Sequence, residues 1–421
     1  MSHLFSTLLI SVFLLQNPAL DSVSPKEREA AIEKLAVLGN VDAIPALLEA
    51  YKKEPKSDLR AEILAGFARI RDKSVIAPLA EALRTDIDKD VRLQAIDSLL
   101  RLYIPIEGTS GPLRTIFNKV RSVFFVADRP MVGPEVTVDR ATTTVLAESM
   151  QKDFTDEVRV EAARALGSLK AKDQLPALIA VLEDPKNREH SEVRLEVIHT
   201  LGILRDISAG PALEKTLRDK DRDIVAQAAM SLGLVGYKEA RPAVEDLFRT
   251  SSDRMIKRRS IEGIALMRDP GSAALFESLV GSSDDYYREL AAEGLARLHH
   301  DPKLIQDRWG QEKKANVRNA LAFALVTAGQ DNYLNDLANA LDTRQDYQVH
   351  VYLVELGKFE GKLPELYRYL KSRNPKVRAK MVKVLGDIGD PAAREYVQTM
   401  TDDSDVTVVR EAVAALRKLT K

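Results

Sequence analysis

Apolar and polar residues follow one another along this chain in a pattern that returns about every 31 residues. The clearest copy reads Asp156-Glu-Val-Arg-Val-Glu-Ala-Ala-Arg-Ala-Leu-Gly167. With Arg159 as the reference position, apolar residues lie one place before it and three, four and seven places after it. Because these offsets share one face of an α-helix, we expect each copy to open with an amphipathic helix.

The reference position recurs along the whole chain and is Arg or Lys in ten of twelve copies. Its equivalents are Arg28, Arg60, Arg92, Arg159, Arg194, Val225, Lys257, Arg288, Arg318, Val349, Arg378 and Arg410. Successive spacings are 32, 32, 67, 35, 31, 32, 31, 30, 31, 29 and 32 residues, so one gap is doubled. This regularity indicates an array of repeats. Such an array is expected for a chain of this length, because a single hydrophobic core stops growing at a smaller size.

A second helix is expected in each copy, because prolines recur 17 or 18 residues past the reference and proline suits a first helical turn. They are Pro45, Pro78, Pro176, Pro211 and Pro242. Eight places past the reference the residue is commonly small, as at Gly167 and Gly386. We expect this small residue to let the chain turn at the helix end and to leave room for the neighbouring helix. Only stacked hairpins would bury a continuous core.

The Asp-x-Val-Arg, Ala-Ala and Leu-Gly signature at this period resembles the short HEAT-like repeats first described in phycobilisome lyases, and the resemblance begins near Pro25. It implies an all-α fold, an α-solenoid (superhelix) of about a dozen HEAT-like helical hairpins. HEAT-like arrays serve as scaffolds, adaptors, lyases and DNA glycosylases, so the fold alone does not determine the function.

The first 22 residues differ from the rest, since Leu4 to Leu15 is almost wholly apolar and no Lys or Arg precedes Lys26. Such a stretch is typical of a signal-peptide core and is shorter than the roughly 20 residues of a membrane-spanning helix. We therefore expect residues 1–22 to be a signal peptide and the protein to be exported, as a periplasmic or cell-envelope protein of a bacterial-type cell. An uncleaved anchor and an apolar cap on a cytoplasmic solenoid are the alternatives.

The doubled gap adds an insertion at 103–140 between HEAT-like repeats at 23–102 and at 141–421. Proline and glycine punctuate the insertion, and between them apolar residues at helical spacing, beside basic ones, predict a short amphipathic helix. This helix could cover the solenoid, dock to a protein partner or contact a membrane surface as a minor role. The candidate partner-binding residues are Ile116, Phe117, Val120 and Phe124.

The balance of charge narrows the class of partner. The chain has 62 Lys plus Arg against 63 Asp plus Glu, whereas nucleic-acid binders usually carry a basic excess, so nucleic acid is not the expected partner. We call the recurring basic reference residues the Arg ladder. Acidic residues two or three places ahead of many of them are Asp58, Asp90, Asp156, Glu192, Asp223 and Asp285. We interpret these acids as helix caps and as partners of the Arg of an adjacent repeat, which makes the ladder structural. A stripe that binds anions is the alternative.

Candidate chemistry is sparse in this sequence. There is no Cys, no Gly-rich phosphate loop and no zinc-ligand spacing. The iron-binding HEAT-repeat hydroxylases use paired His-Glu dipeptides, and this chain contains none. We interpret His299-His300-Asp301 as a helix end. Eight of the eleven Tyr lie between Tyr286 and Tyr396, together with Trp309, either as a recognition patch or as core.

These observations lead us to expect no cofactor, no metal and no small-molecule substrate. The leading hypothesis is a non-enzymatic protein–protein interaction scaffold or adaptor whose protein partners the sequence does not identify. One alternative is a lyase, or chaperone-like lyase subunit, for a protein-bound chromophore. Another is a DNA-binding HEAT-like repeat protein.

Overall fold

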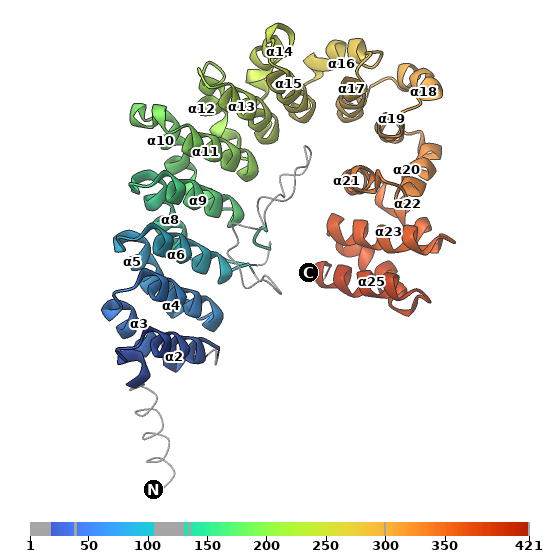
Figure 1. The fold of residues 1–421 in the computed structure, drawn as a ribbon. Helices are drawn as coiled ribbons and strands as arrows, with labels where there is room; N and C mark the ends of the chain where they lie inside the picture. Colours follow the sequence, from blue (N-terminus) through green and yellow to red (C-terminus); the bar gives the residue numbers. More distant parts are fainter. Residues whose placement is uncertain (1–17, 38–39, 105–129, 134–135, 299, 420–421) are drawn as a thin grey trace. The chain divides into compact units, whose positions relative to one another are not determined.

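The computed structural model describes residues 18–37, 40–104, 130–133, 136–298 and 300–419. Within these ranges the regular structure is helical throughout and contains no strand, and the helices stack in pairs as an α-solenoid (Figure 1). The all-α prediction is confirmed. Contacts divide the chain into a first lobe, Met1–Ala243 with Thr250–Arg259, and a second lobe, Val244–Arg249 with Ser260–Lys421.

The first lobe is built from eleven described α-helices joined by short 3-10 turns. Its α-helices are α2 (Pro25–Val37), α3 (Ile44–Lys53), α4 (Ser57–Ile70), α5 (Ile76–Thr85), α6 (Lys89–Arg101), α8 (Arg140–Lys152), α9 (Asp156–Ser168), α10 (Leu175–Glu183), α11 (Ser191–Leu204), α12 (Gly210–Thr216) and α13 (Arg222–Val235). Its 3-10 turns are η1 (Pro18–Asp21), η2 (Val41–Ala43), η3 (Lys73–Val75), η4 (Lys172–Gln174), η5 (Pro185–Glu189), η6 (Ile207–Ala209) and η7 (Lys238–Ala240).

Two helices, α14 (Arg241–Thr250) and α15 (Arg254–Met267), contribute residues to both lobes. The second lobe continues with α16 (Ala273–Leu279), α17 (Asp285–Arg297), α18 (Pro302–Gln311), α19 (Ala315–Thr327), α20 (Leu334–Ala340), α21 (Asp346–Leu356), α22 (Leu363–Tyr367), α23 (Pro375–Ile388), α24 (Arg394–Thr399) and α25 (Val406–Lys418). Its 3-10 turns are η8 (Pro270–Ser272), η9 (Asp331–Tyr333), η10 (Arg368–Lys371), η11 (Pro391–Ala393) and η12 (Met400–Asp402).

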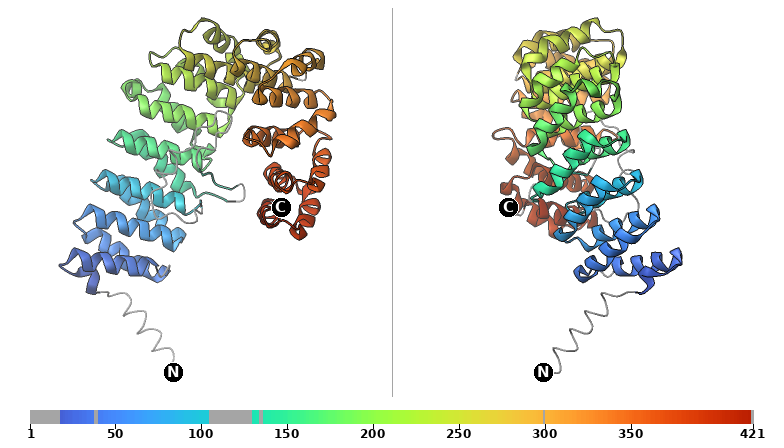
Figure 2. Two further views of the ribbon diagram at one scale, coloured as in Figure 1. Left: turned by 45° about the vertical axis from the view of Figure 1, so that its right-hand side comes forward. Right: turned by 90° about the vertical axis from the view of Figure 1, so that its left-hand side faces the viewer.

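Each repeat is a hairpin of a longer first helix and a shorter second helix. In the first lobe the first helices α2, α4, α6, α9, α11 and α13 form one layer, and the second helices lie in a layer beside them (Figure 2). Pro45, Pro176 and Pro211 occupy the first turns of α3, α10 and α12, as predicted. The 3-10 turn before a second helix is often capped by an acid, for example Asp72, whose side chain accepts the N–H of Ser74.

The small residue eight places past the reference does not end the first helix. Gly386 lies inside α23, where a Cβ atom would be 2.7 Å from the Cβ of Ala415 on α25. The chain turns three residues later, in the left-handed region, at Gly389 (φ 74°) and, in other repeats, at Gly236 (φ 73°) and Arg205 (φ 50°). The expected turn at this position is therefore wrong, and the expected room for a neighbouring helix is confirmed.

The Arg ladder ties the first helix of a hairpin to the end of the same hairpin. Its ion pairs, measured from Nε or Nη2 to the carboxylate, include Arg28–Glu54 (2.7 Å), Arg60–Asp86 (2.8 Å), Arg92–Asp153 (2.8 Å), Arg288–Glu312 (2.8 Å) and Arg378–Asp403 (2.7 Å), and Arg194 pairs with Asp219 in the same way. The structural interpretation is thus confirmed for these members. The partner differs from the expected one, because the acid lies in the loop ahead of the next first helix, at the end of the preceding second helix. The guanidinium of Arg92 also donates to the carbonyl oxygens of Asp86 and Ile87, so it fixes the loop of its own repeat as well.

The insertion lies inside the third hairpin, between α6 and α8. Arg92 on α6 pairs with Asp153, and Lys89 Nζ lies 2.7 Å from Glu157 Oε2 on α9, so the fourth repeat stacks directly on the third. The candidate residues Ile116, Phe117, Val120 and Phe124 lie outside the described residues, as do residues 1–17 of the predicted signal peptide. Within the described part of the chain, every helix is too short or too polar to cross a bilayer.

Candidate functional site

Buried ionisable side chains gather at one place in the second lobe, where α17, α19 and α21 lie next to one another. Glu289, Glu293 and Arg297 follow one another at four-residue intervals and therefore share one face of α17. Tyr352 and Glu355 lie on a face of α21 that reaches them past α19. Within this set Glu293 has no exposed surface and Arg297 is 8% exposed, which is unusual for charged residues.

We call these five residues and the amide groups that bind them the acidic network. Its inner half, Glu293, Arg297, Tyr352 and Glu355, is a chain of charged hydrogen bonds. The hydroxyl of Tyr352 donates to Oε1 of Glu293 at 2.5 Å, and Nη1 of Arg297 donates to Oε2 of Glu293 at 3.2 Å. Arg297 also donates to both oxygens of Glu355, from Nε at 3.0 Å and from Nη2 at 2.9 Å. Arg268 adds a further donor to Glu355 at 2.9 Å. The two carboxylates are therefore tied to each other through one guanidinium.

The outer half of the network leads to the partly exposed Glu289. Nδ2 of Asn316 on α19 donates to Oε2 of Glu289 at 2.6 Å, and Nε2 of Gln348 on α21 donates to Oε1 at 2.5 Å. The same Gln348 nitrogen lies 2.9 Å from the hydroxyl oxygen of Tyr352. Amide groups therefore hold the partly exposed Glu289 in place and connect it to the buried half.

Close packing keeps water away from the inner half. The rings of Phe323 on α19 and Tyr352 are stacked, with centroids 4.6 Å apart and planes inclined by 6°. On the other side of α17, a Cβ atom at Gly294 would lie 2.4 Å from the ring of Phe276. The glycine therefore lets α16 approach α17, and the carboxylate of Glu293 is enclosed between helices.

The surroundings of the three glutamates shift their pKa values in different directions. Burial raises the pKa of Glu293 to about 7, against the attraction of Arg297. Burial also raises the pKa of Glu289, with a further contribution from the charge of Asp285. Burial acts in the same direction on Glu355, but the charges of Arg297 and Arg268 outweigh it and hold the pKa of Glu355 below its usual range. Glu293 can thus exchange a proton near neutral pH while Glu355 remains ionised.

The repeat pattern does not reveal this network, although one signal of it is present in the sequence. The enrichment of Tyr after Tyr286 is compatible with a recognition patch or with core, and in the structure the hydroxyls of Tyr352 and Tyr286 donate to the buried carboxylates of Glu293 and Glu262. Others have packing roles, such as Tyr333, whose ring meets Trp309 at 4.9 Å. The described aromatic side chains therefore do not form a single recognition patch.

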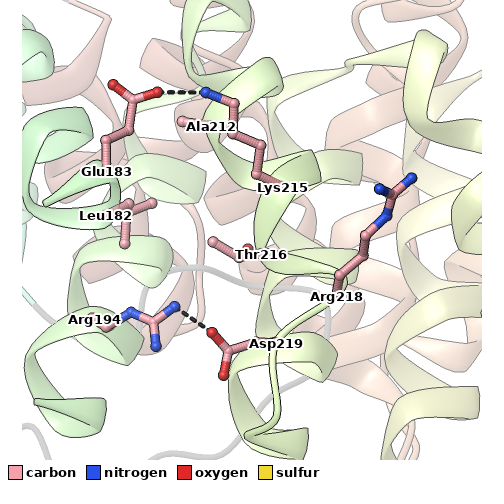
Figure 3. A pocket seen from close by; sticks show the side chains of 8 residues that line it. All are labelled: Leu182, Glu183, Arg194, Ala212, Lys215, Thr216, Arg218 and Asp219. Carbon is pink, nitrogen blue, oxygen red and sulfur yellow. Dashed lines mark hydrogen bonds and ion pairs between the residues drawn. The ribbon is translucent and has the colours of Figure 1, made fainter. Parts of the chain in front are cut away.

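A cavity of about 250 Å³ lies between α10, α11 and α12 in the first lobe (Figure 3). Two ion pairs cross it. Lys215 pairs with Glu183 at 2.7 Å, and Arg194, a member of the Arg ladder, pairs with Asp219. Burial opposes ionisation of Asp219, but the hydrogen bonds from Arg194 and from the N–H of Asp221, together with the charges of Arg194 and Lys220, outweigh it and lower the pKa of this carboxyl group. These charges satisfy one another, so we regard the cavity as a junction between repeats.

Side chains that bind metals are dispersed. Among the residues that the structure describes, no group of three or more His, Cys, Asp or Glu could hold a metal ion. Four histidines are each paired with a single carboxylate, namely His190 with Asp156 (2.8 Å), His199 with Glu196 (3.8 Å), His300 with Glu277 (2.9 Å) and His350 with Asp387 (2.9 Å). The chain beside His300 leaves α17 at Arg297 and enters α18 with Asp301 as its cap, so the interpretation of His300-Asp301 as a helix end is confirmed.

Comparison with known proteins gives a family and a class of relatives. The family profile described as HEAT repeats matches residues 15–100, 143–232, 217–296 and 334–417. Deoxyhypusine hydroxylase of Candida albicans is 23% identical over 306 residues, which cover 68% of this chain and 95% of that protein. Deoxyhypusine hydroxylase of Debaryomyces hansenii is 26% identical over 221 residues, which cover 49% of this chain and 70% of that protein.

Two crystal structures of importin beta share the fold. One has a TM-score of 0.54 and 14% identity, covering 99% of this chain and 66% of that one. The other has a TM-score of 0.52 and 14% identity, covering 97% and 62%. At this identity the likeness concerns the helical solenoid alone.

The expectation of a non-enzymatic scaffold is wrong, because the similar proteins of assigned activity are enzymes, the deoxyhypusine hydroxylases. The lack of a recognised catalytic motif does not exclude an enzyme, since side chains brought together by the fold need not be close in sequence. The iron of His-Glu hydroxylases is not matched by the donors present, since the sequence has no His-Glu dipeptide and the described histidines are dispersed.

Proposed function

Since this chain belongs to the HEAT-repeat family, we propose that it is an enzyme that acts on an amine-bearing side chain of a protein substrate. The observation that carries this proposal is the alignment with the Candida albicans deoxyhypusine hydroxylase over 95% of that protein's length. Deoxyhypusine is a lysine residue lengthened by an aminobutyl group, so its side chain carries positively charged amines. The acidic network of α17 and α21 is the part of the described structure whose chemistry suits such a group.

Glu289 is the residue that meets the amine. Its carboxylate is partly exposed and is held by Asn316 and Gln348, so it faces a ligand without a large loss of side-chain entropy. Asp285, one helical turn earlier, adds negative potential, as its effect on the pKa of Glu289 indicates. An ammonium group placed here would stabilise the ionised form of Glu289 and would be bound in return.

Glu293 and Tyr352 act behind Glu289 as proton-holding and positioning residues. The pKa of Glu293, raised by burial to about 7, lets this carboxyl group take up or release a proton at neutral pH. The Tyr352 hydroxyl lies between Glu293 and Gln348 and keeps the two halves of the network in register. Because the donors present do not fit an iron site, these side chains are assigned binding of the amine and exchange of its proton, and no oxygen-insertion step.

The test is the intact mass of a deoxyhypusine-bearing protein after incubation with the purified full chain. One reaction contains a metal chelator, and a second contains ferrous iron in air. Amine binding and proton exchange leave the substrate mass unchanged by themselves, so the readout is the rate of any mass change. We expect this rate to fall about tenfold or more with Glu289→Gln, with or without the chelator. Glu395→Gln, on the exposed part of α24, is the matched control and should keep the wild-type rate.

Two outcomes would contradict the proposal. An unchanged substrate mass in both reactions would remove the enzymatic function on this substrate class. A mass gain of one oxygen atom that requires ferrous iron would retain an enzyme but transfer the chemistry from the acidic network to a metal site.

A further inference from the structure

Three apolar side chains of the first lobe are almost fully exposed. They are Val23 (98% exposed), Ile87 (87%) and Phe154 (80%). Each lies five residues ahead of a member of the Arg ladder, in the loop that leads into a first helix. The exposed Pro55 occupies the same place in the second repeat. The first four repeats thus share an apolar residue at this position, and we call Val23, Pro55, Ile87 and Phe154 the apolar ridge.

The remaining repeats serve as an internal comparison. Their residues at the same position are Glu189, Lys220, Ser252, Ser283, Lys313, Arg344, Arg373 and Asp405. The position therefore accepts polar and charged side chains without any change in the repeat pattern. A large apolar side chain left in water forgoes roughly 1.5–3 kcal/mol of burial. The polar residues of the later repeats show that helix packing does not require an apolar side chain here, and among the ridge residues the ring of Phe154 also contacts the guanidinium of Arg92. An apolar residue at this position in four consecutive repeats points to a surface that is covered when the protein binds another molecule.

Hydrogen bonds from the Arg ladder hold the loops that carry the apolar ridge. Nη1 of Arg60 donates to the carbonyl oxygen of Pro55 at 3.1 Å, and Nη1 of Arg92 donates to that of Ile87 at 3.3 Å. The guanidinium of Arg92 also lies 4.1 Å from the centre of the Phe154 ring. Since consecutive repeats stack about 10 Å apart, the four side chains form a row about 30 Å long on one edge of the first lobe.

We propose that the apolar ridge docks the protein substrate through a segment with apolar side chains spaced to match the repeats. This inference rests on the proposed function for the identity of the occupant. The charges beside the ridge favour a protein over a membrane or a nucleic acid, because each loop carries both signs, with Lys56 near Asp58 and Lys89 next to Asp88. Such a mixed border offers no net attraction for a polyanion or an anionic bilayer and fits the polar rim of a protein interface.

The test measures the affinity of the full chain for a fluorescently labelled deoxyhypusine-bearing protein. Ile87→Asp and Phe154→Ser are expected to weaken binding about tenfold each, because central apolar residues carry most of an interface's energy. Lys220→Asp changes the same position of a later repeat and should leave the affinity within about twofold of wild type. Because Ile87 and Lys220 are exposed, denaturant unfolding should show unchanged stability for Ile87→Asp and Lys220→Asp. Phe154→Ser also removes the ring beside Arg92, so its stability is expected to fall by up to about 1 kcal/mol while the protein remains folded at the temperature of the binding assay.

The outcomes separate this inference from the proposed function. Ridge variants that bind as tightly as wild type would overturn the docking surface, while turnover and its dependence on Glu289 would still support the enzyme. Loss of binding in the ridge variants, with binding retained in Glu289→Gln, would support the ridge even if turnover were absent. Ridge-dependent binding to phosphatidylcholine and phosphatidylglycerol vesicles, or ridge-dependent self-association, without binding of the labelled protein would overturn it.

Discussion

Tyr352 on α21 donates its hydroxyl hydrogen to Glu293 on α17, with 2.5 Å between the two oxygen atoms, although the complete hairpin of α19 and α20 separates them in sequence. This bond joins helices of alternate repeats, whereas each pair of the Arg ladder closes a single hairpin. It is the contact on which the stability of the acidic network can be tested most directly.

Removing that hydroxyl should destabilise the protein. We expect Tyr352→Phe to lower the free energy of unfolding by about 1–3 kcal/mol, because Glu293 then loses a donor inside a site that water does not enter. Tyr333→Phe provides a matched control, since the Tyr333 ring is also buried but packs against Trp309. Urea unfolding of both variants checks the prediction, and equal losses would show that the hydrogen bond contributes nothing specific.

The raised pKa of Glu293 makes stability depend on pH in a defined direction. The folded carboxyl group titrates at about 7 and an unperturbed one at 4.5, so the folded state holds the extra proton between these values. The contribution of this group is therefore complete below about pH 4.5 and declines as the pH rises to about 7, by about 3 kcal/mol. In Glu293→Gln this decline should disappear. Unfolding free energies of wild type and variant at pH 5 and pH 7.5 provide the measurement, and parallel profiles would refute the assignment.

The buried ladder pair between Arg92 and Asp153 should matter far more than an exposed pair. The side chains are 1% and 5% exposed, so Arg92→Ala leaves an unpaired carboxylate in the interior and is expected to cost about 3–5 kcal/mol. The pair of Arg222 with Asp253 is the control, because the Arg222 side chain is 76% exposed and its loss should cost less than about 1 kcal/mol. Denaturant midpoints that shift equally would contradict a structural role for the ladder.

The helix ends give a prediction of the opposite sign. Arg205 adopts a left-handed conformation with φ of 50°, which costs a residue with a Cβ atom about 1 kcal/mol, so Arg205→Gly is expected to stabilise the protein by up to about 1 kcal/mol. Gly236 occupies the same place in the next repeat with φ of 73° and open space around it. Gly236→Ala should therefore destabilise by a similar amount. Thermal unfolding of both variants tests the pair, and changes of the same sign would exclude backbone strain as the cause.

Much of the fold could be predicted because the repeat pattern is local. The segment from Asp156 to Gly167 was expected to be helical, and α9 spans Asp156–Ser168. The ladder was also recognisable as structural. Its true partner was missed because Glu54 lies 26 residues past Arg28, while Asp58 near the helix start looked like the nearer choice. Outside the repeat that carries the insertion, the acid lies 24 to 26 residues past the Arg, and this recurring separation was the signal that could have identified it.

The acidic network could not be predicted in the same way. Glu293 and Tyr352 are 59 residues apart, so their contact depends on how closely α17 and α21 approach across α19, and the repeat pattern does not encode that distance. The one local hint is Glu293 itself, which stands where the next repeat has Phe323. The class of function was missed for a related reason, since a solenoid of this kind supports binding and catalysis alike.

Each of these pairs of the Arg ladder takes its cation from the first helix of a hairpin and its anion from the residue that caps the end of the same hairpin. A duplicated hairpin would therefore bring a complete pair with it, and a deleted hairpin would remove a complete pair. Such an array can lengthen or shorten by whole repeats during evolution without exposing an unmatched charge at the junction. Changes of a few residues lack this protection, which favours growth of the protein in steps of one hairpin.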